Sequence, residues 1–258
     1  MDLLLFSFGE VRHVTAQDFT IGFLEKVIND MAKDGKVFSN EAQFQFDLGR
    51  ELECKTGCRV LFEVLSLDKE SQHGKHYTDL VIDFGNQEYI AIELKYKTGA
   101  KDEKKKPSKG YCQQLNAFVY SPLGSEDQVV VFPQGAEDEG SYLFLWDVYR
   151  LQKLTAGEIA FHLDKKPPVK GFAIILANSR KYWEGPKKSP VVWEAFSLQE
   201  DRVIPGGVEL KWKEGSIQAK TKHPLVFAKD YTCKWEPYPL ELRERSTDYP
   251  LKYMILEV

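Results

Sequence analysis

The sequence contains no apolar run long enough to cross a bilayer, and it contains few cysteines. A membrane-spanning helix needs about 18 or more consecutive apolar residues, and no stretch of the 258 residues reaches that length. The amino-terminal region lacks the basic segment and the apolar core of a secretory signal. Cys54, Cys58, Cys112 and Cys233 have no paired CxxC spacing, so we expect reduced thiols in a cytoplasmic protein.

The chain also lacks a large charge of one sign. Its formal net charge is −4, so its overall composition gives no attraction to nucleic acid, and any DNA-binding surface must be a local basic patch. Apolar residues make up 43% of the chain, which is enough for a substantial core and argues against extensive disorder. The length suits one large domain, or a core with appendages.

The sequence does contain an apolar hairpin. Residues 78–84 and 88–96 read as two strands, and Gly85-Asn86 between them tolerates the positive φ of a tight turn. Side chains two residues apart share a face of a strand, so Glu93 and Lys95 point the same way, as do Asp79 and its second neighbours.

Charged groups on such strands require an explanation. Burying Asp79, Glu93 and Lys95 costs free energy unless they pair with each other or bind a cation. Two converging carboxylates form a hard oxygen site that suits Mg²⁺, and an adjacent lysine can orient a water or hold a phosphate oxygen. This combination suits phosphodiester hydrolysis. The alternative is a purely structural ion pair between a carboxylate and Lys95.

Asp79 followed by Glu93-Leu94-Lys95 at the end of a hairpin resembles the PD-(D/E)XK nuclease superfamily, although Thr78 replaces the usual proline. The resemblance implies that Asp79 and Glu93 bind Mg²⁺, for which Mn²⁺ can substitute, and that Lys95 assists the attacking water. Many members of the superfamily also carry a glutamate on the first core helix, aimed at the metal. Glu41 is the matching residue here.

Glu41 opens a predicted helix over residues 41–54. Its apolar stripe is Phe44, Leu48 and Leu52, and Glu41 lies near the middle of that stripe at 100° per residue. Two explanations stay open: Glu41 reaches the metal site, or it sits in the first turn, points outward and complements the helix dipole. In the following strand, residues 58–67, Glu63 interrupts the apolar run and is either a group near the site or an edge charge.

Acid-x-Lys is a common pattern, and the tripeptide Glu-Leu-Lys itself recurs at residues 209–211. Glu209 follows Pro205-Gly206-Gly207 and has no acidic hairpin strand before it. Only the set Asp79, Glu93 and Lys95 has the hairpin context.

The order of predicted elements supports the same family. Helix 41–54, strand 58–67, the hairpin, helix 141–154 and the apolar strand 171–177 follow the αβββαβ order of the core implied by the resemblance. The predicted fold is therefore α/β and restriction-endonuclease-like, with a mixed central sheet flanked by helices. Within helix 141–154, Asp147 and Arg150 are expected to pair on the surface.

The remaining elements are assigned around this core. We expect a strand at residues 3–8, a helix at 15–33, a helix at 111–120, a strand at 128–132 and a final strand at 253–258. The predicted organisation is an amino-terminal strand and helix (1–38), the nuclease core (39–180) and a β-rich extension of the same domain (181–258).

Basic residues near the hairpin are candidates for contacts with nucleic acid. Residues 97–110 are polar and lysine-rich and leave directly from the second hairpin strand, where they could neutralise phosphates, or form a solvated loop. Arg180 and Lys181 precede Tyr182 and Trp183, which either stack on bases or are partly buried. The predicted nucleic-acid contacts are Lys97, Lys104, Lys105, Lys106, Arg180 and Lys181.

The sequence thus predicts a Mg²⁺-dependent deoxyribonuclease, an endonuclease that hydrolyses DNA phosphodiester bonds. One alternative is a catalytically inactive nucleic-acid-binding or interaction protein on the same fold. Another is an ordinary sheet in which Glu93 and Lys95 form a surface ion pair. DNA is the expected partner, and assembly into a homodimer stays open.

Overall fold

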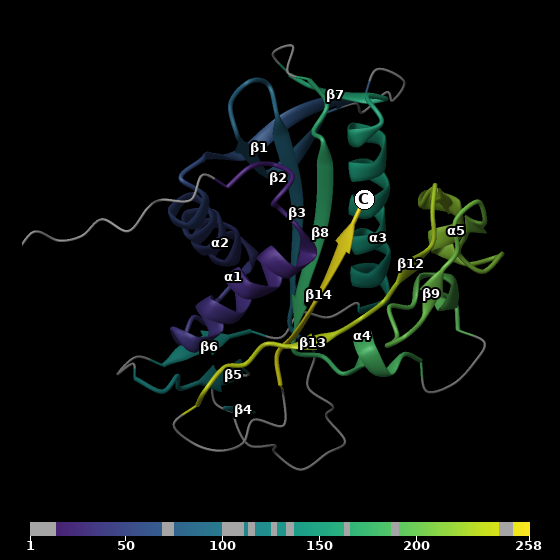
Figure 1. The fold of residues 1–258 in the computed structure, drawn as a ribbon. Coiled ribbons are helices and arrows are strands. Elements are labelled where there is room, and N and C mark those ends of the chain that lie inside the picture. Colours follow the sequence, from purple (N-terminus) through teal and green to yellow (C-terminus); the bar gives the residue numbers. More distant parts are fainter. Residues whose placement is uncertain are drawn as a thin grey trace, which may run out of the picture.

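The computed structural model shows an α/β fold with a central sheet between helices (Figure 1). The residues it describes are 14–68, 75–99, 111–112, 117–124, 128–132, 137–162, 166–186, 191–242 and 250–258. The strand expected at residues 3–8 and the lysines Lys104, Lys105 and Lys106 lie outside these ranges.

The central sheet is mixed, and within the described residues it has seven strands. In spatial order they are β13 (Glu236–Pro237), β14 (Lys252–Glu257), β8 (Lys170–Ala177), β3 (Tyr89–Lys97), β2 (Lys75–Asp83), β1 (Arg59–Asp68) and β7 (Ile159–Phe161). β3 and β8 run parallel, whereas the other neighbouring pairs are antiparallel. The predicted hairpin is confirmed as β2 and β3, and the final strand is confirmed as β14.

The turn between β2 and β3 is longer than two residues. Gly85 and Asn86 have the positive φ values that the sequence predicts, 79° and 50°, but Gln87 also has a φ of 63°. Phe84 and Glu88 close the loop, because the Phe84 N–H donates to the Glu88 carbonyl at 3.0 Å.

Helices cover both faces of the sheet because its middle strands are apolar on both sides. α1 (Ile21–Lys33) and α2 (Glu41–Thr56) lie on one face, and α3 (Glu137–Thr155) lies on the other (Figure 1). Along β3, Ile92 and Leu94 are buried toward α1 and α2, whereas Ala91 is buried toward α3. No helix in the described ranges is long and apolar enough to cross a bilayer.

Side-chain caps fix the starts of α1 and α2. Asn40 Oδ1 accepts the Gln43 N–H at 2.8 Å, so α2 begins at Glu41 as predicted. Thr20 Oγ1 accepts the Phe23 N–H at 3.2 Å, and α1 therefore begins at Ile21. The prediction that this helix begins at residue 15 is wrong, because Thr15 and the following residues form a separate turn.

The helix predicted over residues 111–120 is also wrong. This stretch contains β4 (Tyr111–Cys112) and β5 (Ala117–Tyr120), which pair with each other, and β5 also pairs with β6 (Val129–Val131). The spacing of apolar residues resembles a helix, but Phe118 is buried in a small sheet and pairs with Val131. A pairing partner distant in sequence thus overrides the local pattern.

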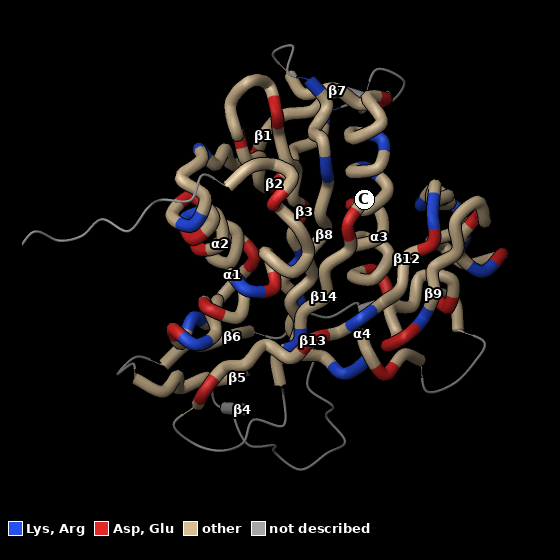
Figure 2. Tube along the Cα trace, in the orientation of Figure 1, with Lys and Arg blue, Asp and Glu red and all other residues tan. Residues whose placement is uncertain are grey.

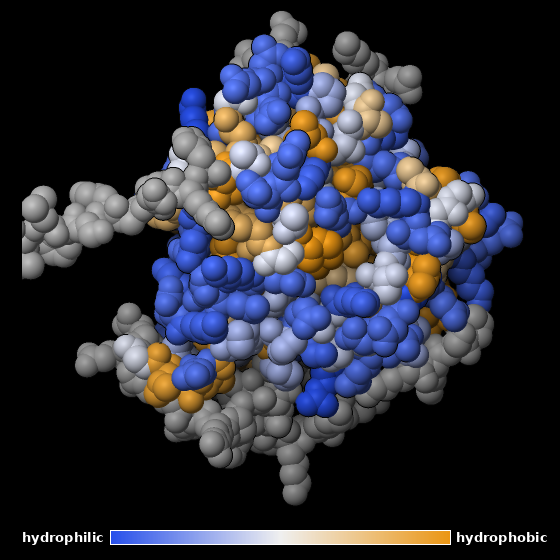
Figure 3. Space-filling model, viewed as in Figure 1, coloured by the Kyte–Doolittle hydropathy of each residue, from blue (hydrophilic) through white to orange (hydrophobic). Residues whose placement is uncertain are grey.

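The part of the chain after β8 packs against the α3 side of the sheet. Its short elements are α4 (Lys181–Glu184), a 3₁₀ helix (Glu194–Phe196), β9 (Val203–Ile204), β10 (Glu209–Leu210), α5 (Ile217–Thr221), β11 (Leu225–Val226) and β12 (Tyr231–Thr232). The chain then returns through β13 and β14 to the sheet. The surface seen in Figure 3 is mostly hydrophilic, with apolar side chains visible near its centre.

Candidate active site

β2 and β3 separate at the position of the predicted site. Their pairing runs from Asp83 and Tyr89 to Leu80 and Ile92 and ends there. Beyond that point β2 pairs, among the described strands, with β1 alone, and β3 continues beside β8 as far as Lys97. Asp79 on β2 and Glu93 on β3 are therefore the first residues beyond the last β2–β3 pair, where the sheet opens.

Two carboxylates occupy this opening and accept hydrogen bonds from the backbone of β3. The Leu94 N–H donates to Asp79 Oδ2 at 2.6 Å, and the Tyr96 N–H donates to Glu41 Oε2 at 2.8 Å. β3 thus binds one carboxylate from β2 and another from α2, which brings these two predicted site residues to the same part of the strand.

Glu41 contacts the site, although it also lies in the first turn of α2. Its side chain is 40% exposed, and Oε1 lies 3.8 Å from Lys95 Nζ. The explanation in which Glu41 only points outward and complements the helix dipole does not account for these two contacts.

Helix α3 contributes two site residues that the sequence assigned to its surface. Asp147 Oδ2 lies 2.7 Å from Lys95 Nζ, and Arg150 Nη2 pairs with Glu93 Oε1. Arg150 Nη2 also lies 3.3 Å from Asp147 Oδ1. The predicted surface pair is therefore wrong in its location, since the side chains of Asp147 and Arg150 are only 7% and 16% exposed.

A signal for Asp147 was present in the sequence. It lies three residues after Phe144 and four before Leu151, within the apolar stripe that packs on the sheet. Arg150 follows Asp147 by one turn and falls on the same side. Opposite charges at this spacing usually indicate a solvated pair, and the prediction of a surface pair between Asp147 and Arg150 rests on that rule.

Burial dominates the electrostatics of the two carboxylates from the hairpin. It raises the pKa of Asp79 to about 6, although Lys95 and the Leu94 N–H act in the opposite direction. Burial also raises the pKa of Glu93 well above its usual value, and the charge of Arg150 offsets only part of this effect.

For Lys95, burial affects the pKa less than the neighbouring charges together do. Burial lowers its pKa, but Asp147, Glu41 and Asp79 together outweigh burial and leave the pKa above the ordinary lysine value. Lys95 is therefore an ammonium ion at neutral pH. The pKa of Arg150 is likewise raised, since Glu93 and Asp147 outweigh its burial.

The charges of this cluster suit a divalent cation. Among the described residues, four carboxylates, from Glu41, Asp79, Glu93 and Asp147, face two cationic side chains, Lys95 and Arg150. Carboxylate oxygens are the donors that Mg²⁺ prefers. Among the described residues no three His, Cys, Asp or Glu side chains are grouped as metal ligands. Glu93 pairs with Arg150, and the Asp79 and Glu41 carboxylates accept hydrogen bonds from backbone N–H groups.

The other Glu-Leu-Lys tripeptide lies in a different environment. Glu209 and Lys211 form a pair at 3.6 Å, with side chains 53% and 73% exposed. Only the tripeptide at residues 93–95 is buried beside further carboxylates, as the hairpin context predicts.

Three of the predicted nucleic-acid contacts lie at one edge of the sheet. Lys97 ends β3, and Arg180 and Lys181 follow β8, so the parallel pairing brings all three to the same end. Two hydrogen bonds join these segments: Asn178 N–H donates to the Lys97 carbonyl at 3.1 Å, and Gly99 N–H donates to Asn178 Oδ1 at 2.7 Å. Lys97 is two residues from Lys95, so this edge adjoins the site.

The aromatic residues beside Arg180 and Lys181 do not form an open stacking surface. Tyr182 and Trp183 are 2% and 9% exposed, and both rings pack against Trp235. Of the two explanations that the sequence left open for them, the structure supports burial.

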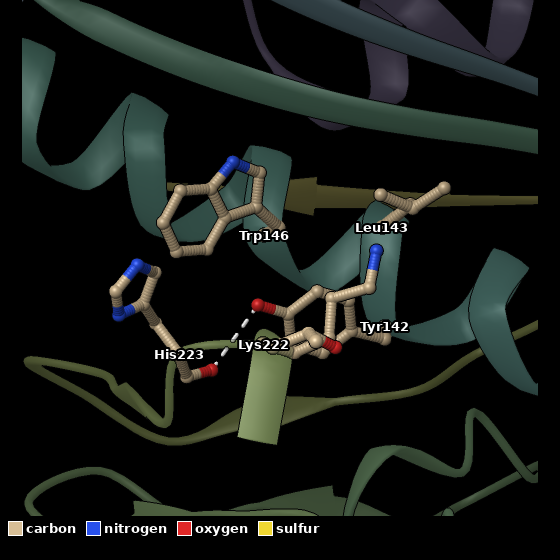
Figure 4. Close-up of a pocket in the computed structure, with 6 residues that line it drawn as sticks. Tyr142, Leu143, Trp146, Lys222 and His223 are labelled. Atoms are coloured by element: carbon tan, nitrogen blue, oxygen red, sulfur yellow. Dashed lines mark hydrogen bonds between the residues drawn. The ribbon is translucent and has the colours of Figure 1, made fainter. Parts of the chain in front are cut away.

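A hollow of about 180 Å³ lies on another side of α3 (Figure 4). Its lining includes Tyr142, Trp146, Lys222 and His223, and the Tyr142 hydroxyl donates to the His223 carbonyl at 3.1 Å. Lys222 pairs with Glu139 at 2.7 Å, so its charge is already compensated. None of the predicted site residues lines this hollow.

No protein-family model, no curated protein and no solved structure matches the chain.

Proposed function

We propose that the protein is a Mg²⁺-dependent nuclease that hydrolyses phosphodiester bonds in DNA. The observation that carries this proposal is the cluster at the opening between β2 and β3, where Asp79, Glu93, Lys95 and Glu41 come together and the carboxylates outnumber the cationic side chains of the described residues. The order α2, β1, β2, β3, α3, β8 supports a restriction-endonuclease-like core and a PD-(D/E)XK site.

In this proposal Asp79, Glu93 and Glu41 hold the metal ion. Bound Mg²⁺ would polarise the scissile phosphate and lower the pKa of a bound water. The carboxylates must be ionised to bind a cation, and the raised pKa of Asp79, about 6, means that protons compete for that residue in weakly acidic solution.

Lys95 acts as a cation and not as a general base. Its raised pKa keeps the ammonium group protonated, and Asp147 holds Nζ at 2.7 Å. A group held in this way can bind a phosphate oxygen or orient a water molecule, and it favours negative charge that develops on the phosphate. Asp147 is accordingly a positioning residue for Lys95.

The two Glu-Leu-Lys tripeptides provide a matched test. Glu93→Gln and Lys95→Met should each lower the rate of plasmid cleavage in Mg²⁺ by about 100-fold or more, because the first removes a carboxylate that binds the metal and the second removes the cation beside the phosphate. Glu209→Gln and Lys211→Met make the same chemical changes in the exposed tripeptide and should leave the rate unchanged. Equal cleavage by all four variants and the wild type would refute the site.

A catalytically inactive nucleic-acid-binding or interaction protein is the second candidate. The ion pairs Arg150–Glu93 and Lys95–Asp147 favour it, because they compensate buried carboxylates without a metal. Thermal unfolding with added Mg²⁺ or Mn²⁺ separates the two candidates. A metal at 100 times its Kd should stabilise the nuclease by about 2.7 kcal/mol, whereas the inactive protein should show no change.

A further inference from the structure

Strand β1 contains a residue in the left-handed conformation directly opposite Asp79. Phe62 pairs with Leu80 and Val64 pairs with Thr78, so Glu63 stands across from Asp79. The φ of Glu63 is 50°. A residue with a side chain rarely adopts this conformation in a strand, and it persists only where its surroundings hold it in place.

One side chain from α2 joins this residue to the backbone of Asp79. Gln45 Nε2 donates to Glu63 Oε1 at 2.8 Å and to the Asp79 carbonyl at 2.7 Å. A primary amide has two N–H groups, so a single Gln45 can make both bonds. Gln45 follows Glu41 by one turn, so both residues lie on the same side of α2.

Asp79 is therefore held at two points. Gln45 fixes its carbonyl from the α2 side, and the Leu94 N–H fixes its carboxylate from β3 at 2.6 Å. Because the β2–β3 ladder has already ended, neither bond belongs to the pairing of these two strands. The direction of the Asp79 carboxylate depends on both bonds.

We propose that Gln45 and Glu63 are positioning residues that orient the Asp79 carboxylate for binding of the metal ion. This inference rests on the proposed nuclease function and deepens it. Gln45 sets the position of the Asp79 backbone, and Glu63 sets the direction of the Gln45 amide. A displacement of a fraction of an ångström at such a residue is enough to weaken catalysis.

Four variants distinguish a positioning role of Gln45 and Glu63 from a general effect on folding. Gln45→Leu removes both hydrogen bonds, and Glu63→Leu removes the acceptor for the Gln45 amide. Glu63→Gln retains an acceptor oxygen and, unlike Glu63→Leu, should behave as the wild type does. Gln218→Leu, on the short helix α5, makes the same chemical change as Gln45→Leu at a distance from the site and is the control.

Amide hydrogen exchange tests the positioning without any cleavage assay. We expect the Leu94 amide to exchange about tenfold faster or more in Gln45→Leu and Glu63→Leu, because its acceptor, the Asp79 carboxylate, is displaced. Exchange in α3, for example at Val148, should stay unchanged. Glu63→Gln and Gln218→Leu should match the wild type.

Cleavage kinetics then test the catalytic consequence. We expect kcat to fall by about 10- to 100-fold in Gln45→Leu with little change in KM, whereas kcat of Glu63→Gln should match the wild type. If Gln45→Leu does not fold, Glu63→Gly provides the same test, since glycine adopts a φ of 50° without strain. It removes the acceptor carboxylate and should also lower kcat and speed Leu94 exchange.

The outcomes distinguish this inference from the proposed function. A wild-type protein that cleaves no DNA would overturn the nuclease function and with it a catalytic role for Gln45, even if the exchange data show that Gln45 orients Asp79. A wild-type protein that cleaves DNA, with unchanged kcat and unchanged Leu94 exchange in Gln45→Leu or Glu63→Gly, would overturn the positioning role alone.

Discussion

Ionisation of Asp79 lowers the free energy of unfolding. Burial raises its pKa from 3.8 to about 6, so the folded state retains a proton that the unfolded chain releases at lower pH. The extra stability of the protonated form is complete below about pH 4 and is lost as the pH rises through about 6. Above that range the ionised carboxylate is held in the opening of the sheet at a cost in stability.

Asp79→Asn should therefore stabilise the metal-free protein at high pH. Asparagine keeps an acceptor oxygen for the Leu94 N–H and carries no charge. We expect the free energy of unfolding at pH 8 to rise by about 1–3 kcal/mol relative to the wild type. At pH 4 the two proteins should have the same stability.

Urea unfolding in a chelating buffer across this pH range measures the difference. A stability difference that does not change between the two pH values would show that Asp79 is not the group responsible. The same variant should lose cleavage activity, because its side chain no longer supplies a carboxylate to the metal.

Among the elements, those defined by local signals were predicted well. α2, β1, the hairpin and β8 follow from apolar periodicity, a cap at Asn40 and turn residues at Gly85-Asn86. Each of these signals is contained in a few neighbouring residues. Residues 111–120 were mispredicted because the strand pairing of Phe118 depends on Val131, which is distant in the sequence.

The same distinction applies to the site. Asp79, Glu93 and Lys95 could be chosen from the sequence because the hairpin is a local feature, whereas Glu41 was chosen from the resemblance to the nuclease superfamily. Asp147 and Arg150 could not be placed in the same way, since an opposite-charge pair at i and i+3 looks alike on a solvated or a packed helix face. Only the packing of α3 against β3 decides between these environments.

The location of Arg150 on α3 has a measurable consequence. Removing Arg150 leaves the carboxylate of Glu93 buried without its partner, so Arg150→Met should lower the free energy of unfolding by about 3–5 kcal/mol at neutral pH. The double variant Arg150→Met/Glu93→Gln removes the unpaired charge and should recover most of the loss. Denaturant unfolding of Arg150→Met, Glu93→Gln and the double variant gives the coupling free energy between the two residues.

Arg180 provides the matched control. It pairs with Glu184 at 3.9 Å on the surface of α4, with side chains 59% and 43% exposed. Arg180→Met should change stability by less than about 1 kcal/mol, as is typical of exposed pairs. Equal small effects of Arg150→Met and Arg180→Met would contradict a stabilising buried charge pair between Arg150 and Glu93.

For the whole molecule, the distribution of charge matters more than its total. The net charge of −4 opposes binding to a polyanion, and Figure 2 shows basic and acidic residues interspersed along the chain. The parallel pairing of β3 and β8 nevertheless brings Lys97, Arg180 and Lys181 to the edge next to Lys95. We expect this edge to carry the salt-dependent part of DNA binding.

Replacing these three residues with glutamine should weaken DNA binding and reduce its dependence on salt. Each lost phosphate contact lowers the slope of log K against log salt by about 0.9, so the triple variant should lose about 2–3 units of slope. Fluorescence anisotropy of a labelled duplex in a chelating buffer, from about 50 to 200 mM salt, measures this slope without cleavage.

The triple variant Lys211→Gln/Lys213→Gln/Lys220→Gln is the control, because it makes the same change in net charge on the segment after β8 that includes β10 and α5. If long-range attraction governed binding, both triple variants would lose affinity equally, since each shifts the net charge by the same amount. A loss of slope confined to Lys97, Arg180 and Lys181 requires direct contact between phosphates and this edge. Because the edge adjoins Lys95, such contact would also place the DNA backbone beside the opening between β2 and β3.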